Sequence, residues 1–150
     1  MQEHNFFPTK VFTSNKILNN KDMLEKLYTL QKNNFDYFSG GWQSKRNIYK
    51  LNEFFPLVDY IKNSLFLVFK KSVTILDMWG TISPQNSYNK IHNHPSLQYT
   101  EGLLWSGVYY IKTFTNSGFL NIHSPMNPSN IEQLSPIPGD LILFRANTYH

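Results

Sequence analysis

The sequence predicts a mainly β protein with helices near its N-terminus. Apolar residues recur at helical spacing in two windows before residue 72, and five short runs rich in β-branched and aromatic residues follow between residues 73 and 146. Turn signals separate these runs, and no helical pattern lies between them. An antiparallel sandwich or barrel is therefore favoured over a parallel sheet.

The first elements are a short strand and a helix. Residues 5–12 alternate enough for a strand near Pro8. Asn19 and Asn20 then offer an N-cap for a helix over residues 21–33. Its apolar stripe consists of Met23, Leu24, Leu27 and Leu30.

A loop and a second helix follow. Residues 35–49 contain a Ser-Gly-Gly sequence and are expected to form a loop anchored by Trp42. Asn52 is the predicted cap of a helix over residues 52–71, where Pro56 is tolerated because it lies near the first turn. The residues predicted to line one side of this helix are Phe55, Val58, Ile61, Leu65 and Val68.

The strands are expected in the second half of the chain. The five runs cover residues 73–79, 88–94, 103–114, 118–124 and 140–146. Gly107, inside the third run, indicates close approach of another backbone. The length of 150 residues fits a single domain, with helical support over about 19–70 and the β part over about 73–150.

Composition excludes several classes of protein. The chain has no cysteine, so disulfides, thiolate catalysis and cysteine zinc sites are ruled out. The formal charge is +4, but the basic residues are scattered, so we expect no nucleic-acid partner. The sequence shows neither a signal peptide nor a transmembrane run, so we expect a soluble, cytoplasmic protein without a membrane partner.

His92 and His94 are the candidate metal ligands. Side chains two apart on an extended chain point to the same side, so the two imidazoles can bind one ion. Imidazole suits Zn, Cu, Fe and Ni, and His150 is the candidate third ligand. The alternative is a pair of solvated histidines on an edge strand. His123 is either a fourth imidazole near the site or a residue satisfied elsewhere.

Four pieces of the sequence resemble a family of small phage- or bacterium-encoded 2-oxoglutarate/Fe(II)-dependent oxygenases of the prolyl-hydroxylase-like group. The pieces are NFFPTKVF, GGWQS, the block over residues 79–112 and PGDLILFRANTYH. They occur in the family's order and cover most of the chain. The specific signals are H-x-H-P followed by SGVYY, and PGDLILF ahead of a histidine.

The resemblance implies a double-stranded β-helix, or jelly roll, that holds Fe(II) through His92, His94 and His150. It implies 2-oxoglutarate and O2 as cosubstrates and no catalytic residue beyond the metal ligands. Tyr110 matches the tyrosine that binds the 2-oxoglutarate carboxylate, and Tyr109 would then lie in the core; the alternative is that both tyrosines only pack. The implied substrate is a peptidyl, prolyl-type residue of a peptide or protein, or another small molecule.

Two positions depart from the family pattern. The wider superfamily uses two histidines and a carboxylate, whereas His94 stands here at the carboxylate position. If His94 were the first ligand instead, Ser96 would offer only a neutral hydroxyl. The cosubstrate arginine is expected on a strand after the distal histidine, and neither Arg46 nor Arg145 matches it. We therefore expect a longer chain, with a last strand beyond His150 that carries this arginine.

Two other functions remain open. A cupin-like metalloenzyme without 2-oxoglutarate would add a glutamate ligand, for which Glu101 and Glu132 are the candidates. A non-catalytic jelly roll, such as a phage structural or carbohydrate-binding protein, is the second alternative. The oligomeric state also stays open, with a homodimer as one option, and a phage-encoded protein would act in the host cytoplasm.

Overall fold

The computed structural model describes residues 1–6, 9–33, 37–38, 40–94 and 104–150. The predicted mainly β character, with few helices and several antiparallel sheets, is confirmed. The chain forms two compact units, one from Met1–Ile17 with Ile91–His150 and one from Leu18–Lys90. The N-terminal strands thus belong with the C-terminal part of the chain.

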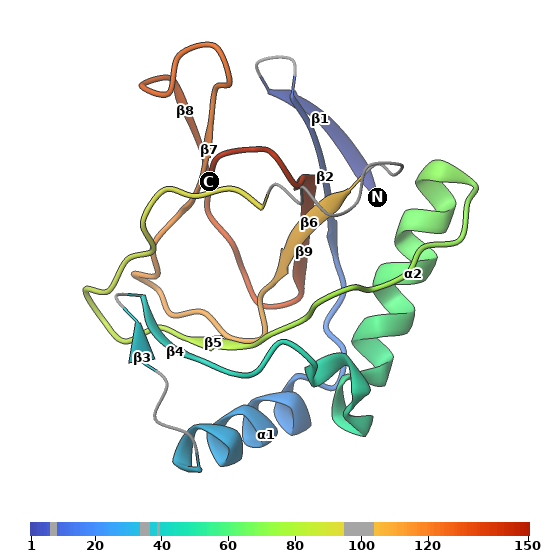
Figure 1. The fold of residues 1–150 in the computed structure, drawn as a ribbon, viewed down its shortest axis with the longest axis vertical. Coiled ribbons are helices and arrows are strands. Elements are labelled where there is room, and N and C mark those ends of the chain that lie inside the picture. Colours follow the sequence, from blue (N-terminus) through green and yellow to red (C-terminus); the bar gives the residue numbers. More distant parts are fainter. Residues whose placement is uncertain (7–8, 34–36, 39, 95–103) are drawn as a thin grey trace. The chain divides into compact units, whose positions relative to one another are not determined.

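A four-stranded antiparallel sheet is the main element of the first unit (Figure 1). Its order is β1 (Gln2–Phe6), β2 (Thr9–Asn15), β9 (Asp140–Arg145) and β6 (Trp105–Tyr109). The prediction of one strand over residues 5–12 was wrong, because β1 and β2 are separate strands that pair with each other. β1 pairs with β2 from Gln2 onwards. The alternation of apolar and polar residues is weak near Gln2, so the sequence did not indicate a strand there.

One face of this sheet forms a core with β7 (Leu120–His123). Val11 on β2 lies opposite Phe144 on β9, and Ile142 lies two residues further along. Side chains two apart share a face, so these three point the same way and pack with Ile122 of β7. All four are buried. The core positions the residues that follow β9.

Gly107 confirms the expected close approach of two strands. It lies opposite Leu143 in the pairing of β6 with β9. A Cβ atom at Gly107 would lie 2.4 Å from Leu143 Cδ2 and 2.8 Å from the Ile142 carbonyl oxygen. No side chain larger than glycine fits there without displacement of β9.

A hairpin of β7 and β8 (Ile131–Leu134) completes the regular strands of this unit. The expected turns are present: the amide of Ser117 donates to the carbonyl of Phe114, and Gly139, with φ of 93°, precedes β9. The strand over residues 118–124 is confirmed in shortened form, whereas β8 was not predicted. Glu132 and Gln133 interrupt any apolar run, so β8 has no strand signature of its own.

Residues 88–94 do not form a regular strand, contrary to the prediction. His150, expected on the strand before the last, follows β9 after a turn at residues 146–147 and also lies outside any strand. Isolated backbone hydrogen bonds replace a continuous ladder in both segments.

The second unit contains both α-helices. Helix α1 (Asn20–Lys32) buries Met23 and Leu27, which confirms the centre of the predicted stripe. The Asn19 side chain does not cap the backbone; its Nδ2 donates to Asp22 at 2.6 Å. Lys26 on α1 forms a 3.0 Å ion pair with Glu53.

The second predicted helix begins later than expected. Two 3-10 turns, η1 (Ile48–Lys50) and η2 (Asn52–Phe54), precede α2 (Phe55–Phe69), in whose first turn Pro56 lies. Asn52 is therefore not its cap. Phe55 is 47% exposed, so its predicted place on the buried side was wrong. The buried residues of α2 are Leu57, Val58, Ser64 and Leu65.

A small sheet crosses the region predicted as a loop. Its strands are β3 (Tyr37–Phe38), β4 (Gly41–Gln43) and β5 (Thr81–Ile82). Trp42 is fully buried, which confirms it as the anchor. Residues 73–79, predicted as a strand, contribute only an isolated bridge at Met78. Among the described residues, no helix has the length and apolarity needed to cross a membrane.

Candidate metal centre

Backbone hydrogen bonds place the three predicted ligands beside one another. The amide of His92 donates to the carbonyl of His150 at 3.0 Å, and the amide of His150 donates back at 2.9 Å. The amide of His94 donates to the carbonyl of Ala146 at 2.7 Å. The reciprocal pair resembles one rung of an antiparallel ladder, so the main chain brings together ligands far apart in sequence.

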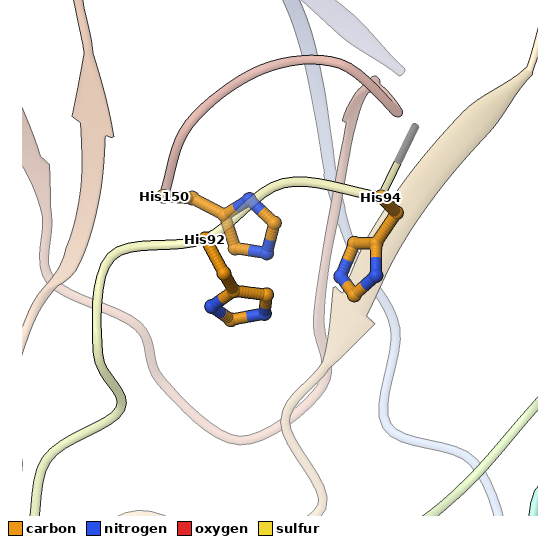
Figure 2. Close-up of side chains that lie close together, drawn as sticks. All are labelled: His92, His94 and His150. Carbon is orange, nitrogen blue, oxygen red and sulfur yellow. The ribbon is translucent and has the colours of Figure 1, made fainter. Parts of the chain in front are cut away.

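The three imidazoles converge as predicted (Figure 2). Ring centroids lie 4.9 Å apart for His92 and His94, 4.5 Å for His92 and His150, and 5.1 Å for His94 and His150. One ligand nitrogen from each ring lies within 4.8 Å of the other two. These side chains form a three-point cluster.

The ring of His150 is held in one orientation. Its Nδ1 lies 2.9 Å from the carbonyl oxygen of Thr148. A carbonyl only accepts, so Nδ1 carries the proton and Nε2 presents its lone pair to a metal. The ring of Phe144 lies 4.6 Å from the His150 ring and supports it from the core side. Both contacts fix the ligand before any ion binds.

The electrostatic environment keeps His150 neutral. Burial, opposed by the hydrogen bond to Thr148 and aided by the nearby imidazoles of His92, His94 and His123, lowers the pKa of His150 to about 4. A metal binds the neutral form of imidazole. His150 therefore needs no deprotonation at neutral pH to act as a ligand.

The donor set suits a first-row transition metal. Two imidazole nitrogens bound to one ion, with bonds of about 2.1 Å each, lie about 3 Å apart. The 4.8 Å limit in the cluster is wider than this, so the rings would have to move closer together to share one ion. No Asp or Glu of the described residues belongs to the cluster, so its three members are all imidazoles.

Tyr110 lies on the core face of the four-stranded sheet, beside the start of β9. It packs against the core that contains Phe144, the residue that contacts His150. Burial raises the pKa of Tyr110 to about 12, and the negative charge of Asp140 adds to the effect, so the hydroxyl stays protonated. Tyr109, expected in the core, instead donates from its hydroxyl to the carbonyl of Lys16 at 3.0 Å. Tyr109 and Tyr110 are neighbours in an extended stretch of chain, so their side chains point to opposite faces of the sheet. Tyr110, and not Tyr109, therefore packs on the core.

His123 lies near His150, but its ring makes its hydrogen bond outside the cluster. It is only 4% exposed, and its Nδ1 lies 2.8 Å from the carbonyl oxygen of Pro128. Its amide donates to the carbonyl of Tyr149, so it helps to position the segment that carries His150. It does not belong to the cluster.

The remaining sequence candidates do not join the centre. Glu132 lies exposed on β8 and outside the cluster, and Glu101 lies outside the described residues, as does Ser96. Arg145 ends β9, with its guanidinium 5.2 Å from the centre of the Trp105 ring. It contacts this ring rather than a ligand of the cluster.

Two supporting residues were not predicted. Thr148 acts through its backbone carbonyl and Phe144 through its aromatic ring. A backbone contact has no residue-type signature, and Phe144 belongs to a run that indicates only a strand. Comparisons with protein-family models, curated proteins and solved structures find no match for this chain.

Proposed function

We propose that this protein is a non-haem Fe(II)- and 2-oxoglutarate-dependent oxygenase with a jelly-roll domain. The convergence of His92, His94 and His150 within 4.8 Å carries the proposal. A four-stranded antiparallel sheet that shares a core with a β-hairpin supports the jelly-roll part of it. The motifs H-x-H-P and PGDLILF support the family assignment.

The residues of the chain have separate tasks in this proposal. Nε2 of His150 and one nitrogen each of His92 and His94 hold the iron. The carbonyl of Thr148 keeps the proton of His150 on Nδ1, away from the metal. The protonated hydroxyl of Tyr110 donates to a carboxylate of 2-oxoglutarate and so orients it.

Bound Fe(II), with 2-oxoglutarate and O2, supplies the oxidising power to hydroxylate an unactivated C–H bond. The chain itself contributes placement and limited access of water, because Phe144 and Ala146 are buried beside the ligand segment. A peptidyl substrate of the prolyl type is the first to test, and this choice rests on the resemblance alone.

The test is anaerobic loading of the chelator-treated protein with Fe(II), followed by measurement of O2-dependent succinate formation from 2-oxoglutarate. We expect one iron per chain and succinate formation that the variants His92→Ala, His94→Ala and His150→Ala abolish. His4→Ala is the matched control, because His4 contacts Thr13 and lies outside the cluster. Stoichiometric iron without any succinate would contradict the oxygenase.

A second candidate is a metalloenzyme that does not use 2-oxoglutarate. The cluster without a carboxylate among the described residues favours it, because the usual facial site of these oxygenases has two histidines and one carboxylate. Calorimetric titration of the metal-loaded protein with 2-oxoglutarate separates the two functions. Saturable binding that requires the metal supports the oxygenase, and its absence supports the second candidate.

A further inference from the structure

The charge of the proposed centre is not balanced by the described residues. Imidazole binds a metal as a neutral ligand, so His92, His94 and His150 leave the full charge of a divalent ion in place. Sites with a carboxylate ligand remove one unit of this charge. Here the cluster contains no such group from the described part of the chain.

The acidic residues described in this unit lie outside the cluster. The carboxylate of Asp140 accepts from Asn15 Nδ2 at 2.7 Å and from the amide of Ile137 at 2.8 Å. Glu3 pairs with Lys10 at 3.0 Å, and Glu132 lies on β8 outside the cluster. Asp140 and Glu3 could neutralise the ion only by giving up these partners.

The surroundings make an unbalanced charge costly. The His150 ring contacts the ring of Phe144, which is fully buried, and Ala146 is 7% exposed. His94 and His150 are half-buried, and none of the three imidazoles is fully buried. A charge in such a setting is partly desolvated, so an additional negative ligand is favoured.

We propose that the centre formed by His92, His94 and His150 takes a small exogenous anion as a further ligand, in place of a protein carboxylate. This inference rests on the metal centre proposed above. The ligand class is a monovalent anion with a nitrogen or oxygen donor, and a single carboxylate group belongs to it. Azide is the probe, because it is small and its binding alters the visible spectrum of a transition-metal centre.

The experiment titrates the Co(II)-loaded protein with sodium azide and follows the visible spectrum, with ionic strength held constant by perchlorate. Wild type is compared with His94→Asp, which adds one negative charge to the cluster, and with His94→Asn, which has nearly the same shape without the charge. We expect His94→Asp to bind azide at least about tenfold more weakly than wild type and than His94→Asn. Circular dichroism checks folding, and the pair His92→Asp and His92→Asn replaces the first pair if a variant at position 94 unfolds.

Three results would overturn the inference. The first is a Co(II)-loaded wild type whose spectrum does not respond to azide, and the second is equal azide affinity in the Asp and Asn variants. The third is a gain of tenfold or more in azide affinity in Glu101→Gln, because the chain would then supply its own carboxylate. Binding of Co(II) is measured first by calorimetry. Absence of metal uptake contradicts the proposed function as well as the anion site. Metal uptake and succinate formation without an azide response contradict only the anion site.

Discussion

Replacement of His150 by glutamine is expected to reduce the acid sensitivity of the metal-free protein. Burial, together with neighbouring imidazoles, lowers the pKa of His150 from 6.5 to about 4. Between these two pH values the unfolded chain binds a proton at His150 and the folded chain does not. The free energy of unfolding therefore rises with pH across this window, and the contribution is lost as the pH falls from 6.5 towards 4.

The size of the effect follows from the same pKa values. Each pH unit over which only the unfolded chain binds the proton lowers the free energy of unfolding by about 1.4 kcal/mol, which gives about 3 kcal/mol over the whole window. His150 is only half-buried, so solvent screening reduces the expected contribution to about 2 kcal/mol. Glutamine lacks the titrating group and keeps a polar side chain of similar reach.

Urea unfolding of wild type and His150→Gln, measured from pH 7.5 to pH 4 with a chelator present, tests this expectation. The difference in the free energy of unfolding between the two proteins should change by about 2 kcal/mol across the window, in favour of the variant at low pH. His4→Gln controls for loss of an imidazole outside the cluster. Parallel curves for wild type and His150→Gln would refute the assignment of a half-buried, neutral His150 in the folded protein.

Three further outcomes are expected. His92→Ala should abolish stoichiometric metal binding in calorimetry, and an unchanged metal content would show that His92 is not a ligand. Gly107→Ala should lower the free energy of unfolding by about 1–3 kcal/mol through its clash with Leu143, whereas Gly118→Ala, with no atom near its added Cβ, should change little in the same urea measurement. Tyr110→Phe should weaken binding of 2-oxoglutarate by about tenfold and leave metal affinity unchanged, and equal affinities would show that Tyr110 only packs.

Two of the three ligands could be predicted because their signal is local. His92 and His94 are two residues apart, and any extended backbone places such side chains on one side. The convergence is present even though residues 88–94 form no regular strand. The prediction of the ligands therefore depended on backbone extension and not on the strand itself.

The errors in the fold have a different origin. Strand formation depends on partners elsewhere in the chain, so the β-branched run over residues 73–79 stays irregular, whereas the polar residues of β8 pair with β7. Phe55 matched the helical period but lies at the start of α2, where it is exposed. Tertiary pairing decides such cases, and a single sequence does not contain it.

The reciprocal hydrogen bonds between His92 and His150 involve only main-chain atoms. Every amino acid other than proline carries the same amide and carbonyl, so these bonds do not depend on which side chains stand at the two positions. The frame of the centre and its chemistry are thus separable. Substitutions at these positions can exchange one metal preference for another while the frame persists, which makes this pair of segments a suitable starting point for the evolution or design of new metal specificities.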